Sequence, residues 1–332
     1  MVQVSIAGTT SWGTTLAIIL ARRGLDVRLW ARTEDEAAHL RAYGQNSRFV
    51  PGSAFPPDLI ITSDVTDAFG HADLAIVAVP SRSLRENVRA IAEGLTSTAV
   101  VVSATKGLES ASGMRMSQIL VEELGSDTHQ GICAMSGPNL AREIIRGEPS
   151  STVVASDSPE AAAKAQSLIT SPRFRVYTND DIVGVEFGGA LKNIIALGAG
   201  ICDGLGFGDN AKAAFMTRGL AEITRLGVAG GANPLTFAGL AGMGDLVATC
   251  SSTLSRNHHV GEQLANGKTL EETQAGMANV AEGIDTTTAA VLLADRLNVD
   301  MPITRATYEV LFSGRDLEQT ISELLERAPT TE

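Results

Sequence analysis

Lys192 is the residue whose surroundings most clearly suggest chemistry. It is the only cation between Ile182 and Cys202, the most apolar segment of the chain, and Gly188 and Gly189 stand one helical turn before it. Burial favours the neutral form of a lysine, so such a side chain can exchange a proton near neutrality, and small neighbours would let a ligand approach. The alternative is a lysine that extends from the edge of a helix into water. We take Lys192 as a candidate proton donor.

Lys106, Asp245 and Arg256 are the other strong candidates. Lys106 follows an apolar run, where ligands bind in open α/β sheets. Asp245 could orient Lys192 or a substrate hydroxyl. Arg256, in Ser255-Arg256-Asn257, could hold a phosphate group through two hydrogen bonds. The alternatives are a solvated lysine at 106 and helix caps at the other two places.

Two further segments offer groups for a polar ligand. Ser136-Gly137-Pro138-Asn139 precedes a helix predicted from Leu140, whose free N–H groups suit an anion. Val280-Ala281-Glu282-Gly283 places a carboxylate before another helix. A plain helix cap is the alternative for both segments.

A glycine-containing turn follows the first apolar run. Gly8-Thr9-Thr10-Ser11-Trp12-Gly13 separates a predicted strand from a predicted helix, which is the position of a dinucleotide-binding turn. Thr10 stands where a glycine normally lets the backbone approach the pyrophosphate. An ordinary turn that binds no dinucleotide is the alternative.

The residue that selects the ribose is expected about 20 residues further on, at the end of the second strand. Trp30-Ala31-Arg32-Thr33 stands there and contains no carboxylate. Arg32 could pair with the 2′-phosphate of NADP, so the sequence favours NADP(H). A solvated surface arginine is the alternative.

The elements that must position these residues change character along the chain. Short β-rich runs alternate with helical patterns up to about Val154, which predicts a doubly wound parallel sheet of the Rossmann type. The runs are Val2–Ala7, Val27–Trp30, Leu59–Thr62, Leu74–Val79, Ala99–Ser103 and Gly131–Ala134. After about Asn179 the pattern predicts helices alone, near 182–202, 209–229, 254–265, 284–297 and 303–312. We expect a dinucleotide-binding domain over 1–180 and an all-helical domain over 181–332.

Composition narrows the class of protein. The 332 residues carry 26 Lys and Arg against 38 Asp and Glu, a net charge of −12, which disfavours nucleic acid as a partner. Cys133, Cys202 and Cys250 are widely spaced, and His258-His259 lacks a third ligand, so neither disulfides nor a metal site are expected. The N-terminus opens on a predicted strand and shows no signal-peptide pattern, so we expect a cytoplasmic protein. The segment 182–202 contains Glu186 and Lys192, so we expect a buried helix there and not a membrane span.

Seven motifs in register across the chain resemble the bacterial NAD(P)+-dependent glycerol-3-phosphate dehydrogenase family. After Gly8 they are Ser11-Trp12-Gly13-Thr14, Ala104-Thr105-Lys106-Gly107, Ser136-Gly137-Pro138, Gly188-Gly189-Ala190-Leu191-Lys192-Asn193, Arg218-Gly219-Leu220-Ala221-Glu222, Gly244-Asp245-Leu246 and Ser255-Arg256-Asn257. Together they extend over both predicted domains. The resemblance implies reversible hydride transfer between NADP(H) or NAD(H) and dihydroxyacetone phosphate, which yields sn-glycerol 3-phosphate for phospholipid synthesis.

The resemblance also implies roles for individual residues. Lys192 resembles the proton donor, and the matches to substrate contacts are Lys106, Gly137, Asn139, Lys192, Asp245, Ser255, Arg256 and Asn257. The matches to dinucleotide contacts are Gly8, Ser11, Trp12, Gly13, Arg32, Phe49, Lys106, Ala141, Arg256, Val280 and Glu282. A homodimer is the default expectation for such a protein.

The chain departs from the family pattern at three positions. Thr10 replaces a glycine, Thr33 stands where many relatives carry a second basic residue, and Asn139 replaces Ser or Thr. Two alternatives therefore remain open at this point. One is a related NAD(P)-dependent hydroxyacid dehydrogenase, which Arg256 disfavours, and the other is a non-catalytic dinucleotide sensor, which Lys192 and Asp245 disfavour.

Overall fold

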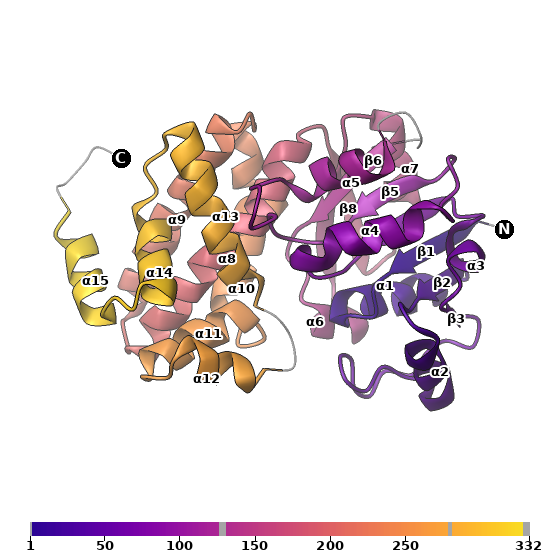
Figure 1. Ribbon diagram of the computed structural model, residues 1–332, viewed down its shortest axis with the longest axis horizontal. Helices are drawn as coiled ribbons and strands as arrows, with labels where there is room; N and C mark the ends of the chain where they lie inside the picture. Colours follow the sequence, from indigo (N-terminus) through magenta and orange to yellow (C-terminus); the bar gives the residue numbers. More distant parts are fainter. Residues whose placement is uncertain (1, 126–130, 278–280, 328–332) are drawn as a thin grey trace.

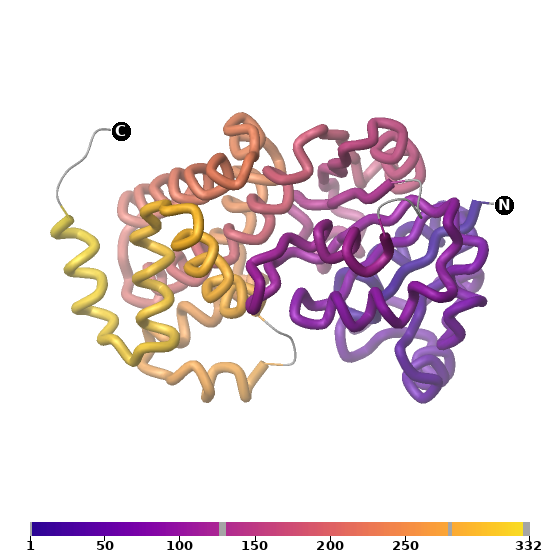
Figure 2. Tube along the Cα trace, turned by 45° about the horizontal axis from the view of Figure 1, so that its top comes forward, coloured from indigo at the N-terminus to yellow at the C-terminus, as the bar shows by residue number. Residues whose placement is uncertain are grey.

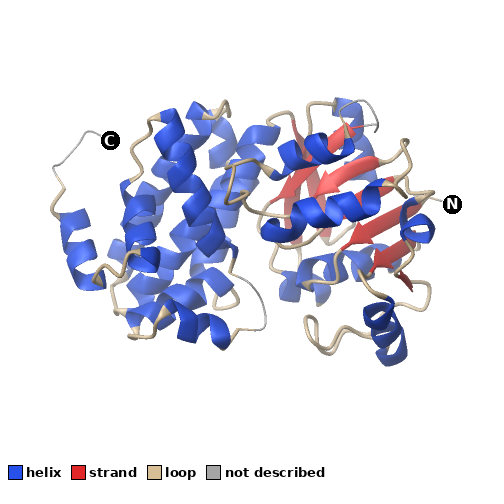
Figure 3. Cartoon of the chain, viewed as in Figure 1, coloured by secondary structure: helices blue, strands red, loops and turns tan. Residues whose placement is uncertain are grey.

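The computed structural model describes residues 2–125, 131–277 and 281–327. Eight strands form one sheet in the order β3-β2-β1-β4-β5-β6-β7-β8. They are β1 (Gln3–Ala7), β2 (Asp26–Trp30), β3 (Ile60–Thr62), β4 (Leu74–Val77), β5 (Val100–Ser103), β6 (Gly131–Ser136), β7 (Ser150–Ala155) and β8 (Phe174–Asn179). Within the described residues the strands lie between Gln3 and Asn179, and they gather on the side of the molecule that carries the N-terminus (Figure 3).

The doubly wound sheet is confirmed, with two corrections. The sequence pattern predicts six strands and a parallel sheet, and it does not indicate β7 or β8. In the structure β6 and β7 pair antiparallel, while β7 and β8 run parallel to each other. β8 alternates buried and exposed side chains, because it is an edge strand with one solvated face. The sheet is therefore mixed.

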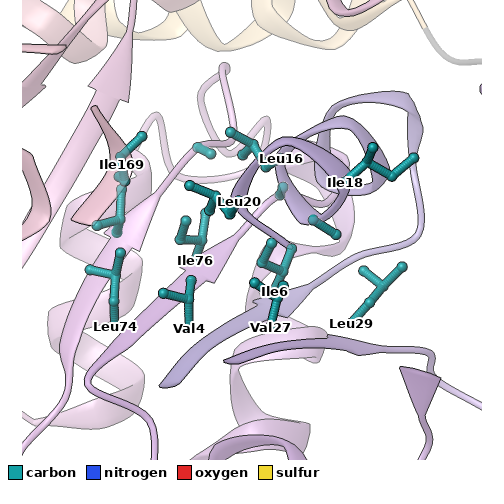
Figure 4. Close-up of a cluster of buried hydrophobic side chains, with 14 of the residues drawn as sticks. Val4, Ile6, Leu16, Ile18, Leu20, Val27, Leu29, Leu74, Ile76 and Ile169 are labelled. Atoms are coloured by element: carbon teal, nitrogen blue, oxygen red, sulfur yellow. The ribbon is translucent and has the colours of Figure 1, made fainter. Parts of the chain in front are cut away.

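Helices cover both faces of the sheet (Figure 1). One face packs against α1 (Ser11–Ala21), α6 (Ala141–Ile145) and α7 (Pro159–Ile169) through a core that includes Val4, Ile6, Leu16 and Leu20 (Figure 4). The other face packs against α3 (Val65–Phe69), α4 (Leu84–Ala92) and α5 (Met116–Leu124). α2 (Glu34–Tyr43) follows β2, and a short 3-10 turn, η1 (Ser81–Ser83), precedes α4. Apolar strands buried on both faces are what parallel sheets require.

The second half of the chain is helical and lies beside the sheet (Figure 2). Its elements are α8 (Ile182–Gly204), α9 (Asp209–Ala229), η2 (Pro234–Ala238), the π-helical turn η3 (Leu240–Gly244), α10 (Asp245–Ser251), α11 (Arg256–Ala265), α12 (Leu270–Ala275), α13 (Glu282–Leu297), α14 (Pro302–Phe312) and α15 (Leu317–Leu325). The five predicted helices are confirmed within two residues at each end. The shorter α10, α12 and α15 lacked a periodicity long enough to predict.

α8 is the central helix of this half and packs against α9, α10, α11, α13 and α14. Its length and mean hydropathy of 1.4 would suffice for a membrane span, but 94% of that apolar window is buried inside the protein. The apolar segment is thus a core helix, as its internal charges predicted.

A buried carboxylate, Glu222 of α9, caps the first turn of α14. It accepts hydrogen bonds from the backbone N–H groups of Ile303 at 2.6 Å and Thr304 at 3.2 Å. Burial raises the pKa of Glu222 to about 7, although these hydrogen bonds oppose the shift. The folded state therefore holds a proton here that the unfolded state releases at lower pH.

This proton makes Glu222 a pH-dependent contributor to stability. Between the unfolded pKa near 4.5 and the folded pKa of about 7, the native chain binds more protons, so stability falls as pH rises. We expect the free energy of unfolding of wild type, relative to Glu222→Gln, to fall by roughly 2 to 3 kcal/mol between pH 4.5 and 8. Urea unfolding at a series of pH values measures this difference, and a difference that does not change with pH would refute it.

Candidate active site

The turn between β1 and α1 depends on two glycines that pack closely against the protein backbone. Gly8 has φ +120°, and a Cβ there would lie 2.4 Å from the Ala78 carbonyl oxygen. A Cβ at Gly13 would lie 2.0 Å from the Gly8 carbonyl oxygen. Both glycines are thus required by close packing of the turn against β4 and against itself. The turn opens at the N-terminus of α1, where N–H groups suit a pyrophosphate.

Thr10 serves the turn without needing to be glycine. It is the N-cap of α1 in an extended conformation, its hydroxyl accepts from Gly13 N at 3.4 Å, and it donates to the Ala78 carbonyl at 2.9 Å. The departure from the family pattern therefore supplies a hydrogen bond between the turn and the end of β4.

We expect Thr10→Gly to lower stability by about 1 kcal/mol, because glycine is a fair N-cap but the bond to Ala78 is lost. The dissociation constant for NAD(P)H should change by no more than about 1 to 2 kcal/mol. Chemical denaturation and titration of nicotinamide fluorescence measure the two effects. Dinucleotide binding that appears only in the glycine variant would contradict this account of Thr10.

Other predicted dinucleotide contacts gather near this turn. Ser11 donates to the Phe49 carbonyl at 3.2 Å, and α6, which begins at Ala141, packs against α1. The Trp12 ring meets Phe174 edge to face at 6.0 Å. Trp12 Nε1 is buried and finds no hydrogen-bond partner among the described residues. An orphaned donor beside a glycine turn fits a site that a dinucleotide completes.

Two lysines share one carboxylate at the carboxyl edge of the sheet. Asp245 accepts from Lys192 Nζ through Oδ1 and from Lys106 Nζ through Oδ2, each at 2.6 Å. Lys192 also donates to Thr249 Oγ1, and Lys106 donates to the Gly137 carbonyl at 2.8 Å. Asp245 is 1% exposed. Three candidate residues, from the loop after β5, from α8 and from α10, are thus brought together.

Burial changes the pKa of one member of this group, Lys106. Burial lowers the pKa of Lys106 to about 8, and the Asp245 carboxylate only partly opposes that shift. Such a lysine changes protonation near the pH at which enzymes work. Thr249 was missed by the sequence analysis, although its position four residues after Asp245 on α10 places both on one helix face.

The glycines before Lys192 have a different purpose from the one predicted. A Cβ at Gly188 would lie 2.5 Å from the Ala241 carbonyl oxygen, and one at Gly189 would lie 2.2 Å from Ser136 Oγ. Protein atoms fill the space that was expected to admit a ligand. These glycines instead let α8 pack close to β6 and to η3, which brings Lys192 to the edge of the sheet.

A second charged group lies next to Lys106. Glu282, at the start of α13, accepts from Ser81 N at 3.3 Å and from Ser81 Oγ, and a Cβ at Gly107 would lie 3.5 Å from Glu282 Oε2. Burial raises the pKa of the Glu282 carboxyl, and Arg256 and Ser81 oppose the shift. Arg256 lies close enough to Glu282 for their charges to interact. Ser81 is a second residue that the sequence analysis did not select.

Two predicted substrate residues, Ser255 and Asn257, make hydrogen bonds that stabilise the helical half of the chain. Ser255 is the N-cap of α11 and accepts from His258 N at 3.2 Å. Asn257 donates to Asn193 Oδ1 and accepts from Gly283 N, both at 2.9 Å, so it ties α8 to α13. The helix-cap alternative thus holds for Ser255.

The segment after β6 corrects one expectation. α6 begins at Ala141, with Leu140 as an N-cap that makes no side-chain cap, and it has five residues. Asn139 does not cap it, because its side chain donates to Thr152 Oγ1 at 2.9 Å. Gly137 contributes its carbonyl to Lys106. This segment therefore holds Lys106 through a backbone carbonyl, and α6 begins without a side-chain cap.

Arg32, a predicted dinucleotide residue, is exposed to solvent. The Arg32 side chain is 56% exposed and its Nη1 lies 3.5 Å from Glu86 Oε1. Val280 lies outside the described residues.

Cys133, Cys202 and Cys250 are free and buried.

Comparisons with known proteins show the family of this chain. The family model for the C-terminus of NAD-dependent glycerol-3-phosphate dehydrogenase matches residues 181–322, and the model for the N-terminus matches residues 3–162. An NAD(P)+-dependent glycerol-3-phosphate dehydrogenase of Dehalococcoides mccartyi is 51% identical over 326 residues, 98% of this chain and 91% of the relative. One from Chlorobium luteolum is 44% identical over 330 residues, 99% of each chain.

Solved structures agree over the whole chain. The crystal structure of glycerol-3-phosphate dehydrogenase from Coxiella burnetii superposes with a TM-score of 0.93 at 35% identity, and covers 98% of this chain and 99% of that one. A ketopantoate reductase from Ralstonia eutropha shares the fold, with a TM-score of 0.60 at 17% identity. The chain belongs to the NAD-dependent glycerol-3-phosphate dehydrogenase family.

Proposed function

We propose that this chain reduces dihydroxyacetone phosphate to sn-glycerol 3-phosphate with NAD(P)H, reversibly, and thereby supplies glycerophospholipid synthesis. The observation that carries this proposal is the pair Lys106 and Lys192 on the shared Asp245 carboxylate, at the sheet edge that also holds the glycine turn. A cationic group of this kind in an acidic protein suits a small anionic substrate. The names of the relatives support the same reaction.

The dinucleotide-binding part is assigned to residues 1–180 and the helical part to 181–332. The glycine turn, the orphaned Trp12 Nε1 and the Arg256–Glu282 group fit a dinucleotide that lies across the carboxyl edge. We assign its binding to Gly8, Ser11, Trp12, Gly13, Arg32, Phe49, Lys106, Ala141, Arg256, Val280 and Glu282. When bound, NAD(P)H supplies the hydride that adds to C2 of the ketone.

Lys192 is the proposed general acid. Its Nζ would give a proton to the ketone oxygen as C2 is reduced, and would take that proton back in the reverse direction. Asp245 and Thr249 hold Nζ in a fixed place through two hydrogen bonds. A proton donor held in this way is positioned before the substrate arrives.

The phosphate of the substrate is assigned to the cations at the same edge. Arg256 can bind phosphate bidentately, and Lys106 adds a second positive charge. We also assign to the substrate site the residues Gly137, Asn139, Ser255 and Asn257. Asn139 is held by its hydrogen bond to Thr152, and Asn257 by its hydrogen bonds with Asn193 and Gly283.

We expect Arg256→Ala to raise the KM for dihydroxyacetone phosphate by about 10- to 100-fold, because a charge-assisted hydrogen bond of about 1.5 to 3 kcal/mol is lost. Steady-state kinetics at saturating NADH measure the effect, with the exposed Arg296→Ala as the control. An unchanged KM and kcat/KM would place the phosphate elsewhere.

Identification of the product tests the reaction itself. Purified chain, NADH and dihydroxyacetone phosphate should yield sn-glycerol 3-phosphate in equal amount to the NADH consumed. NADH consumption without this product would contradict the proposal.

We also propose a homodimer in the cytoplasm. Closed symmetric dimers are the commonest assembly of soluble enzymes. Free, buried cysteines suit a reducing compartment. Sedimentation equilibrium should give twice the chain mass of 34.6 kDa, and a single-chain mass would contradict the dimer.

A further inference from the structure

The fold brings a carboxylate to the dinucleotide turn from α2. No acid stands at the end of β2, but Glu36, in the first turn of α2, accepts a hydrogen bond from Thr9 Oγ1 at 2.5 Å. Thr9 is the residue directly after Gly8. The Glu36 carboxylate therefore lies between the turn that receives the pyrophosphate and the end of β2, where the adenosine ribose is selected.

Thr9 is also held from its other side. Asn46 Nδ2 donates to the Thr9 carbonyl at 2.7 Å and to Thr14 Oγ1 at 2.9 Å, and Asn46 is 4% exposed. The contact between Thr9 and Glu36 thus belongs to a network that fixes the turn, α1 and the loop after α2 together. Glu36 itself is half-buried.

The charge of Glu36 is not neutralised by a neighbouring cation. Within 2–125, 131–277 and 281–327, Glu36 takes part in no ion pair, whereas Glu34 of the same turn pairs with Arg41. Arg32, the cation that was expected to bind a 2′-phosphate, is exposed and faces Glu86. The charged side chain that is hydrogen-bonded to the turn through Thr9 is therefore a carboxylate.

Resting on the proposed function, we propose that Glu36 selects the ribose of the dinucleotide and favours NAD(H) over NADP(H). Its carboxylate can accept a hydrogen bond from the free 2′-hydroxyl of NAD(H), as an acid at the end of β2 does in other dinucleotide-binding folds. The same carboxylate repels the 2′-phosphate of NADP(H), because like charges at short range in a partly buried site interact strongly. Arg32 acts in the opposite direction, and the balance of the two sets the preference.

Glu36→Gln tests this directly, because the amide keeps the shape and the acceptor for Thr9 and loses only the charge. Dissociation constants for NADH and NADPH are measured by nicotinamide fluorescence without substrate. We expect the ratio Kd(NADPH)/Kd(NADH) to fall by about tenfold, which corresponds to about 1.4 kcal/mol. Asp35→Asn is the matched control: it removes the same charge from the exposed neighbouring residue, and it should leave the ratio within about twofold.

Each outcome decides a separate point. A ratio that is unchanged or that rises in Glu36→Gln overturns the assignment, and so does an equal fall in Asp35→Asn, because the effect would then be general to the acidic turn. Arg32→Ala should raise the ratio, which shows that the assay responds to the 2′-phosphate. Wild-type chain that binds neither dinucleotide would instead overturn the proposed function, and this inference with it. A thermal unfolding midpoint close to that of wild type shows that each variant is folded.

Discussion

Lys192→Met is expected to lower kcat by about 10²- to 10⁴-fold, the usual contribution of a positioned general acid, while NAD(P)H affinity stays within about tenfold. Methionine has nearly the length of lysine and suits a buried site, so the change removes the proton and the two hydrogen bonds but little volume. The dinucleotide turn lies on a different element and should keep its geometry.

The measurement is steady-state kinetics with dihydroxyacetone phosphate, paired with fluorescence titration of NADH. Lys268→Met, which changes an exposed lysine on the helical half, is the control and should behave as wild type. Turnover of Lys192→Met near the wild-type rate would remove Lys192 from the proton-transfer step. A loss of NADH binding as large as the loss of kcat would show that Lys192 is structural.

Asp245→Asn should have the second largest effect, a loss of kcat/KM on the order of 10²-fold, because misplaced catalytic groups commonly cost that much. An asparagine can accept a hydrogen bond from one lysine through Oδ1. Its NH₂ group is a donor, so it cannot accept the hydrogen bond that the other lysine donates. Lys106 and Lys192 would lose the negative charge that holds them in place.

The pH profile gives a second measure of the same change. The pKa of Lys106 is already lowered to about 8 by burial, and Asp245 is the main group that opposes the shift. Removal of that carboxylate destabilises the charged lysine, so its pKa should fall further. We expect the alkaline limb of kcat/KM to move to lower pH in Asp245→Asn, with Asp300→Asn, an exposed acid, as control. If the alkaline limb of kcat/KM stays at the same pH in Asp245→Asn, the protonation of Lys106 does not control the activity.

Local patterns were sufficient for the elements whose burial is uniform. The buried strands at Leu74 and Val100 and the long helices α8 and α9 carry their own periodicity, and the structure confirms them. β8 was missed because half of its side chains are polar and solvated, as at Arg175 and Thr178. The antiparallel pairing of β6 and β7 could not be predicted, because the residue pattern of a strand does not tell in which direction the strand runs beside its neighbour.

The candidate site shows the same division. Residue type identified Lys106, Lys192, Asp245 and Glu282, since charges in apolar segments are rare. Their partners depend on contacts between distant parts of the chain: Lys106 and Asp245 are 139 residues apart, and Ser81 and Glu282 are 201 apart. The role of Gly188 also became clear only from what packs against it. The partners of these side chains and the role of Gly188 depend on tertiary packing, which local sequence patterns do not show.

The substrate of the site is decided by the rate of NAD(P)H oxidation by the wild-type chain with dihydroxyacetone phosphate, with glyceraldehyde 3-phosphate and with unphosphorylated ketoacids, each at equal concentration. We predict rapid oxidation with dihydroxyacetone phosphate and at least about 10²-fold lower kcat/KM with the ketoacids, because the cations at the sheet edge would then face no phosphate. Equal or faster oxidation with a ketoacid would assign the site to a hydroxyacid dehydrogenase. If the chain binds the dinucleotide but oxidises it with none of these substrates, it is a non-catalytic dinucleotide sensor, and the proposed dehydrogenase activity is wrong.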